Sequence, residues 1–323
     1  MYLKNKLLCL LGCTALFLSG CSTGFLGLAP LGDRKEYVRA RNLYNEQQYQ
    51  QAANELTQYI YKAGNVKRRE ARAYRLLGMS YEQLGQLDKA LEVYLEALEF
   101  HPKNVPLLVA AAELYQKAGL VDRSQELFDR AQEEDPHNAE ALTGQAENYR
   151  SFGFYSKART YYDQFFELNP QADPVYRARY ASTFLNQRNY EQAFIHITMA
   201  LAQDNSVPDY WLISSKAAFG LGNYKQALAD LDTALHLAPE RADLHLYKIM
   251  GLYQRGLYTQ SLQETRQFLT SRPKDPLALL FAALNEWELG QKKTARFHLK
   301  QAAEINPDSF VGQVATKLAQ EWK

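Results

Sequence analysis

Three cysteines carry the most reactive side chains of this sequence, and all of them lie within its first 21 residues. The spacing of Cys9 and Cys13 would suit a metal or redox site. Both, however, fall inside an apolar run over residues 7–18, which is about half as long as a bilayer-spanning helix. Such a run is typical of a cleavable signal peptide, which the mature chain lacks. Cys21 would then be the only thiol left, so we expect no disulfide and no cysteine-based metal site.

The other residues that could catalyse a reaction or bind a metal are scattered along the chain. Catalysis or metal binding needs two or three such groups at a spacing that brings them together. Neither the helix-borne carboxylates nor the histidines show one, and no phosphate-binding glycine loop or nucleophile elbow is present. We therefore predict that the protein is not an enzyme and needs no cofactor or metal. The six histidines are His101, His137, His196, His236, His245 and His298.

The residues around Cys21 suggest a different chemistry for this thiol. Lysines at positions 4 and 6 precede the apolar run, and Leu-Ser-Gly-Cys closes it at 18–21. This arrangement resembles the lipobox of bacterial lipoproteins, in which the cysteine is acylated and becomes the first residue. The resemblance implies a signal peptide over 1–20, lipidation at Cys21 and attachment to a membrane. Ser22 in the next position implies the outer membrane, with the protein facing the periplasm. The alternative is an ordinary secretory peptide with a chance cysteine.

Residues 21–33 are predicted to form a lipidated tether, because they contain several glycines and a proline but no helical period. Four apolar side chains in this stretch are unusual for a linker. They would lie either at the lipid interface or against the protein itself. The four are Phe25, Leu26, Leu28 and Leu31.

The overall composition is typical of a soluble, folded protein. Hydrophobic residues make up 46% of the 323 residues, and 37 basic residues nearly balance 36 acidic ones. A net charge of +1 provides no general attraction to nucleic acid, and we expect no nucleic-acid partner.

A period of about 34 residues fills the chain from 34 to 307. A small residue recurs eight times at spacings of 34 to 38 residues. Around the second occurrence, the other residues match the tetratricopeptide repeat (TPR) pattern at every diagnostic position. The sequence thus resembles TPR proteins, and the resemblance implies an all-α, right-handed solenoid of about eight helix-turn-helix repeats. The small residues are Ala52, Ala90, Ser124, Ala158, Ala193, Ala227, Ser261 and Ala295.

Helix packing and helix ends explain the period. Small side chains let the two helices of a hairpin approach closely, while larger residues fill the space between repeats. Glycines between the helices suit a left-handed residue that ends the first helix. Prolines suit the first turn of a first helix or the end of a second one. The glycines are Gly85, Gly119, Gly153, Gly222, Gly256 and Gly290.

Two repeats and the C-terminus depart from the pattern. Arg177 and His245 occupy a position that is normally aromatic or apolar, which predicts a bend or an unusual contact in the fifth and seventh repeats. Residues 308–323 are predicted to form a capping helix, with apolar residues at helical spacing over the last exposed face. These residues are Phe310, Val311, Val314, Leu318 and Trp322.

In the proteins this chain resembles, the first helices line a concave groove. The groove positions of the early repeats here are charged, at Arg34, Arg41, Arg72, Arg75, Glu82, Glu113, Glu147 and Arg150. Those of the late repeats are apolar, at Leu185, Leu212, Phe219, Leu246, Met250, Tyr253, Leu280, Leu284 and Trp287. So much apolar area predicts a site for an extended or helical segment of another protein, with Tyr253 and Trp287 as its anchors. Filling of the groove by the chain itself, or a homodimer face, remains open.

One basic cluster near the predicted lipid anchor could contact anionic lipid head groups or an acidic partner. The alternative is a solvated helix face. The cluster comprises Lys67, Arg68, Arg69, Arg72 and Arg75.

The predicted function is therefore that of a membrane-anchored scaffold of the bacterial cell envelope. The resemblance includes outer-membrane TPR lipoproteins that assist pilus or secretion machinery, and others that dock peptidoglycan hydrolases. An adaptor for such hydrolases and a self-associating structural subunit are the alternatives.

Overall fold

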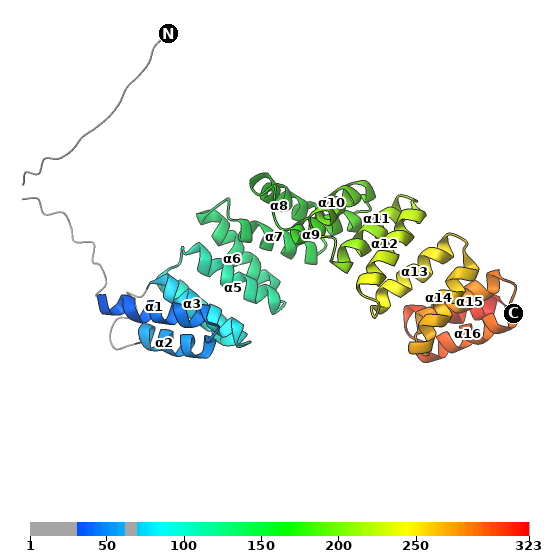
Figure 1. Cartoon of the computed structure of the whole chain (residues 1–323), viewed down its shortest axis with the longest axis horizontal. Helices are drawn as coiled ribbons and strands as arrows, with labels where there is room; N and C mark the ends of the chain where they lie inside the picture. Colours follow the sequence, from blue (N-terminus) through cyan, green and yellow to red (C-terminus); the bar gives the residue numbers. More distant parts are fainter. Residues whose placement is uncertain (1–30, 62–69, 323) are drawn as a thin grey trace, which may run out of the picture. The chain divides into compact units, whose positions relative to one another are not determined.

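The computed structural model describes residues 31–61 and 70–322, and all regular secondary structure in these ranges is helical (Figure 1). Cys21 and the basic residues Lys67, Arg68 and Arg69 lie outside the described residues. The helices are α1 (Leu31–Asn45), α2 (Tyr49–Tyr61), α3 (Ala71–Gln83), α4 (Leu87–Phe100), α5 (Val105–Lys117), α6 (Val121–Glu134), α7 (Ala139–Ser151), α8 (Tyr155–Leu168), α9 (Pro174–Asn186), α10 (Tyr190–Gln203), α11 (Pro208–Gly220), α12 (Tyr224–Leu237), α13 (Ala242–Gln254), α14 (Tyr258–Ser271), α15 (Pro276–Glu288), α16 (Lys292–Ile305) and α17 (Phe310–Glu321).

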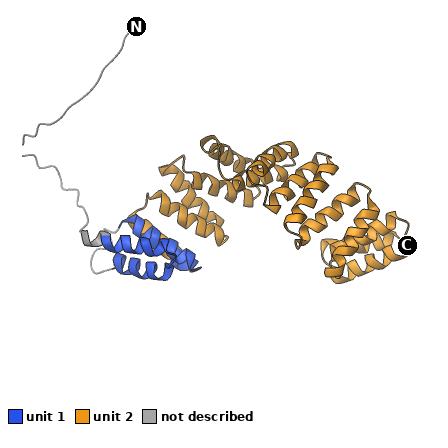
Figure 2. Ribbon diagram, in the orientation of Figure 1, with its two compact units in different colours: residues 1–90 blue, residues 91–323 orange. Residues whose placement is uncertain are grey.

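The chain divides into two compact units, residues 1–90 and 91–323 (Figure 2). In the first unit, α1 packs on α2, α2 packs on α3, and α1 also contacts α3. In the second unit, from α5 onwards, each helix packs on the next along the chain. There α5 also touches α7, α9 touches α11, and α13 touches α15. In these pairs the first helices of successive hairpins are neighbours.

The small residues that define the repeat period occupy the centres of the hairpins. All eight, from Ala52 to Ala295, have no exposed surface. The larger residues expected between repeats are just as buried, and they include Tyr94, Phe128 and Tyr162. A side chain as small as Ala or Ser is needed wherever two helix backbones approach this closely. The repeat assignment and the all-α fold predicted from the sequence are confirmed.

The helix ends also follow the predicted chemistry. The six inter-helix glycines have φ between 71° and 78°, the left-handed region in which a Cβ is unfavourable. Two hairpins lack this glycine and instead hold Gln47 at φ 61° and Arg188 at φ 56°. Proline occupies the first turn of α5, α9, α11 and α15, where its missing N–H breaks no helical hydrogen bond.

The two departures in the fifth and seventh repeats produce the same contact. The Arg177 guanidinium donates to the carbonyl of Pro170 at 3.1 Å, and Nε2 of His245 lies 2.9 Å from the carbonyl of Pro239. Each side chain therefore ties the start of its repeat to the proline that closes the preceding one. Arg177 also lies 3.9 Å from the centroid of the Phe166 ring.

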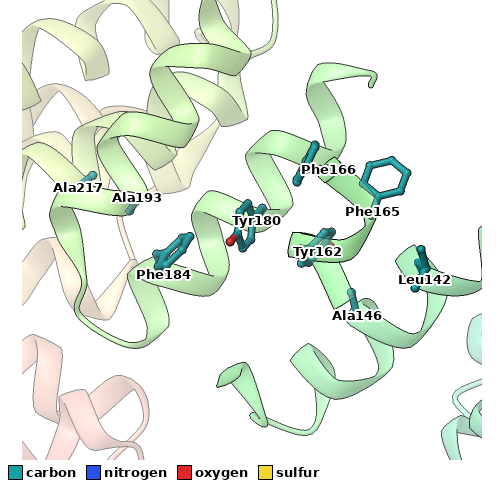
Figure 3. Packing of buried hydrophobic residues seen from close by; sticks show 9 residues of the cluster. All are labelled: Leu142, Ala146, Tyr162, Phe165, Phe166, Tyr180, Phe184, Ala193 and Ala217. Carbon is teal, nitrogen blue, oxygen red and sulfur yellow. The ribbon is translucent and has the colours of Figure 1, made fainter. Parts of the chain in front are cut away.

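Aromatic rings fill the junction between the fourth and fifth repeats (Figure 3). Tyr162 and Phe166 of α8 face Tyr180 of α9 at centroid distances of 5.3 and 5.5 Å. Tyr180 continues the cluster to Phe184 at 4.8 Å. The hydroxyl groups remain satisfied, since Tyr162 donates to Glu147 and Tyr180 donates to Asp163.

A polar pair joins neighbouring repeats wherever the central small residue is serine rather than alanine. The amide of Asn148 on α7 donates to Ser124 on α6 at 3.0 Å. The amide of Asn285 on α15 donates to Ser261 on α14 at 2.8 Å. In both pairs the asparagine follows the serine by 24 residues. All four side chains are buried, so each hydrogen bond satisfies groups that water does not reach.

The two ends of the repeat region differ slightly from prediction. Helix α1 begins at Leu31, three residues before the predicted start of the repeat region at residue 34. At the other end, α17 packs Val311, Val314 and Leu318 against the last repeat. Phe310 takes no part in this contact and is 81% exposed.

No helix within the described ranges is both long and apolar enough to span a bilayer.

Candidate functional site

The predicted apolar groove lies on four first helices of the second unit, α9, α11, α13 and α15. None of its nine residues is fully exposed. Leu212 and Leu280 are buried, with exposures of 7% and 6%, and the other seven are half-buried. The structure therefore separates residues that belong to the core from those that still present surface to a partner.

Leu212 of α11 belongs to the core, and Phe219 packs against it while staying half-buried. Leu212 packs in a cluster with Leu231 and Leu244. The Phe219 ring points directly at Gly251 of α13, where a Cβ would lie 2.2 Å from the ring atom Cζ. Because this ring fills the space left by the glycine, Phe219 joins two repeats. Leu212 therefore presents little surface to a partner, whereas Phe219 remains half-buried, and a binding role for these two residues stays a prediction.

The C-terminal helix covers the far end of the predicted groove. The indole of Trp287 stacks on Trp322 with centroids 4.0 Å apart and an interplanar angle of 11°. Nζ of Lys292 lies 4.9 Å from the centroid of the Trp287 ring. Leu280 and Leu284 pack in the same cluster as α17. At this end of the groove the contacts favour filling by the chain itself, because the half-buried Trp287 stacks on Trp322.

The apolar surface that remains is centred on α13. Leu246, Met250 and Tyr253 are separated by four and three residues, so they share one face of the helix, and all three are half-buried. We call these three residues the α13 strip. Leu185 is half-buried as well and packs against the aromatic junction, just as Leu246 packs against the cluster of Ile249, Phe268 and Ala278.

Tyr253 is held in a defined orientation within the α13 strip. Its ring meets Tyr258 at 5.4 Å and Phe281 of α15 edge-on at 5.7 Å. Burial raises the pKa of Tyr253, and the carboxylate of Glu288 adds to this rise. The phenol is therefore protonated at neutral pH and presents a hydroxyl donor beside an apolar ring, as interface tyrosines often do.

The sequence analysis missed one cation near the α13 strip. Lys216 occupies a groove position on α11, and its Nζ lies 4.3 Å from the centroid of the Tyr247 ring on α13. Lys216 was not predicted, because the apolar residues of the late repeats were the ones taken to mark the groove there. On α13 itself, Lys248 pairs with Asp232 at 3.1 Å and with Glu264 at 3.0 Å.

The charged groove positions of the early repeats fall into two groups. In the first unit, Arg72 and Arg75 of the predicted basic cluster are exposed on α3. In the second unit, Arg150 donates to Glu147 at 2.6 Å, and Glu147 also accepts from the buried Tyr162 hydroxyl. The Glu147–Arg150 pair is therefore engaged in holding α7 to α8.

The histidines on the helices make structural contacts. His245 lies 3.0 Å from Glu264, and His298 lies 2.8 Å from the buried Glu286. A hollow of about 450 Å³ beside His245 is lined by residues such as Glu240, Phe268 and Arg272. In the described part of the chain, no three histidine, cysteine or acidic side chains are grouped in a way that could hold a metal ion.

Family comparisons agree with the repeat geometry. Models of the tetratricopeptide repeat match residues 37–105 and 215–276, and a further one matches 81–147, so that together they cover more than half of the chain. The protein belongs to the tetratricopeptide repeat family. Such repeats serve as protein–protein interaction scaffolds, and no catalytic family is indicated.

Individual proteins are similar over parts of their length. The human RANBP2-like and GRIP domain-containing protein 8 is 33% identical over 92 residues, which are 28% of this chain and 5% of that protein. The anaphase-promoting complex structure Cut9-Hcn1 matches 91% of this chain and 57% of its own, with a TM-score of 0.58 and 15% identity. The structure of YrrB, described as a TPR protein with an unusual peptide-binding site, matches 63% of this chain and 99% of its own. The TM-score is 0.51 and the sequence identity is 19%. At these identities the structural matches establish the fold.

Proposed function

We propose that this protein is a scaffold that binds a segment of a partner protein along the α13 strip. The observation that carries the proposal is the position of Leu246, Met250 and Tyr253 on one face of a first helix, partly exposed and in the layer that TPR proteins present to partners. The proposal is also supported by the similar fold of YrrB, which is described as having a peptide-binding site. The partner segment would place apolar side chains against Met250 and Tyr253.

The proposed location of this scaffold is the bacterial cell envelope, with Cys21 lipidated and the protein held at the outer membrane. The basic head, the apolar run and the Leu-Ser-Gly-Cys sequence at 18–21 support this part of the proposal. Attachment to a membrane would confine the search for partners to a surface, which suits the assembly of pilus or secretion machinery. Cys21→Ala is expected to move the protein from the membrane fraction to the soluble fraction while its helical circular dichroism stays the same.

The binding proposal is tested by crosslinking partners in the native envelope and comparing their recovery between variants. Met250→Ala and Tyr253→Ala should each lower recovery roughly tenfold or more, because truncating a buried anchor is costly for binding. Met199→Ala is the matched control, since Met199 is 47% exposed on α10, a second helix. It should leave recovery unchanged.

The same variants separate a binding role from a structural one. The thermal midpoints of Met250→Ala and Tyr253→Ala should stay close to that of Met199→Ala. Equal recovery by all three variants would contradict the proposal, as would a large loss of stability in Tyr253→Ala. If the crosslinked partner is a second copy of the chain, the protein is a self-associating subunit and the scaffold proposal fails.

A further inference from the structure

A second charged and aromatic surface lies in the first unit, on the neighbouring first helices α1 and α3. It consists of Tyr37, Arg41 and Tyr44 on α1, together with Arg72 and Arg75 on α3. We call these five residues the arginine–tyrosine face. The three α1 residues are spaced by four and three positions and therefore lie on one side of that helix. The three arginines are exposed and the two tyrosines are half-buried.

Direct contacts place the residues of α1 and α3 on a common surface. The Arg72 guanidinium lies 4.7 Å from the centroid of the Tyr37 ring, a cation–π contact that restrains both side chains. Two helical turns further along α1, Tyr44 lies within electrostatic reach of Arg75 and Glu82. Burial raises the pKa of Tyr44. The neighbouring Tyr49 and Glu82 add to this rise, whereas Arg75 opposes it.

The charges on this face are only partly balanced. Arg72 pairs with Glu70. In the described ranges, no carboxylate lies within ion-pairing distance of Arg41 or Arg75. Arg39 provides the contrast on the same helix, because it points toward α2 and pairs with Glu55 at 3.4 Å. The face thus presents two exposed guanidinium groups beside half-buried rings.

We propose that the arginine–tyrosine face binds an acidic segment of a partner protein. Guanidinium groups form bidentate hydrogen bonds with carboxylates, so Arg41 and Arg75 would each hold one acidic side chain. Tyr37 and Tyr44 would contact the apolar parts of the same segment. A peptide fits this face better than an anionic bilayer, because the exposed guanidinium groups alternate with half-buried tyrosine rings and with carboxylates, of which Glu70 already pairs with Arg72. A peptide can place neutral residues opposite them.

The test uses the purified full chain in detergent and a fluorescein-labelled dodecapeptide of alternating glutamate and alanine. Fluorescence anisotropy should show binding that weakens several-fold between 50 and 500 mM NaCl, because salt screens exposed charges. The R41Q/R75Q variant should bind at least about tenfold more weakly. Arg39→Gln, with the same change of charge on the same helix, should stay within about twofold of the wild type. The matching peptide with glutamine in place of glutamate should not bind.

Three results would overturn the proposal. The first is equal binding of the glutamate and glutamine peptides, and the second is unchanged binding by R41Q/R75Q. The third is a set of observations on lipid. The wild type does not bind the peptide, but it cosediments better with vesicles containing 30% phosphatidylglycerol than with phosphatidylcholine vesicles. The R41Q/R75Q variant cosediments equally with both kinds of vesicle. The face would then be a lipid site. If the double variant unfolds, R41Q and R75Q alone, each expected to weaken binding threefold or more, replace it. Variants of the α13 strip should bind the peptide normally, so the two proposals fail separately.

Discussion

His196 on α10 is a histidine enclosed by aromatic rings. Its imidazole lies 4.5 Å from the Tyr180 ring and stacks on Phe184 at 5.3 Å and 5°. Burial lowers the pKa of His196 to about 4, the positive charge of Arg177 contributes, and Asp163 opposes the shift. Nδ1 is buried and has no hydrogen-bond partner among the described residues. Protonation would place an unsatisfied donor there, so the neutral ring is the stable form at pH 7.

The protein should therefore lose stability as the pH falls from about 6.5 to about 4. In that window the unfolded chain takes up a proton that the folded chain excludes, whereas above 6.5 the stability is fully present. The expected loss in free energy of unfolding is roughly 1–3 kcal/mol. Thermal midpoints of the wild type and His196→Phe between pH 7 and 4.5 measure it, because phenylalanine keeps the ring contacts without the charge. Parallel declines in the two proteins would rule out His196 as the cause.

Gly251 matters because of its neighbour and not because of its backbone. A Cβ at Gly251 would lie 2.2 Å from the Phe219 ring, so Gly251→Ala should cost ~1–3 kcal/mol by overpacking. Gly222 has open space around its Cβ position but φ of 74°, so Gly222→Ala should cost about 1 kcal/mol through conformation alone. Urea unfolding measures both. Adding Phe219→Leu should recover part of the Gly251→Ala loss and none of the Gly222→Ala loss.

At the scale of the elements, the turn between α9 and α10 is a place where the sequence is not optimal. Arg188 adopts φ of 56° there, whereas six other turns use glycine. Arg188→Gly should therefore raise the free energy of unfolding by about 0.5–1 kcal/mol, because glycine accepts the left-handed conformation without a Cβ penalty. Urea unfolding checks the gain. Arg188→Ala serves as the control and should give no gain; if both variants stabilise equally, the conformational explanation is wrong.

These elements show why the repeat architecture was predictable from the sequence. The small residues, glycines and prolines act through local rules, since each fixes a helix end or a close approach within its own hairpin. The site was less predictable, because exposure depends on neighbours in other repeats. The Phe219 ring packs against Gly251 of the next repeat. Trp287 stacks on Trp322, which follows Trp287 by 35 residues. The pattern of apolar groove positions alone does not distinguish these residues from Met250, which stays half-buried on α13.

At the scale of the whole molecule, the repeat region depends on its last helix. Repeat arrays expose apolar surface at their ends unless a capping element covers it. Here α17 packs in one cluster with Leu280 and Leu284, and Trp322, the residue that follows α17, stacks on Trp287. A chain that ends at residue 309 should therefore have a lower thermal midpoint and should associate at micromolar concentration.

Light scattering and thermal unfolding measure these two effects. Phe310→Ser is the control, because this residue belongs to α17 but is largely exposed, and the variant should behave like the wild type. A truncated chain that stays monomeric with an unchanged midpoint would show that α17 is dispensable.

The buried pairs Ser124–Asn148 and Ser261–Asn285 limit how this chain can evolve by duplication or exchange of its repeats. Most junctions carry alanine at the serine position and would accept many neighbours. A transplanted fourth repeat, by contrast, would bring Asn148 opposite a methyl group and strand its amide away from water. The order of the repeats is therefore part of the information that the sequence encodes, and a shuffled copy would have to change both members of each pair together.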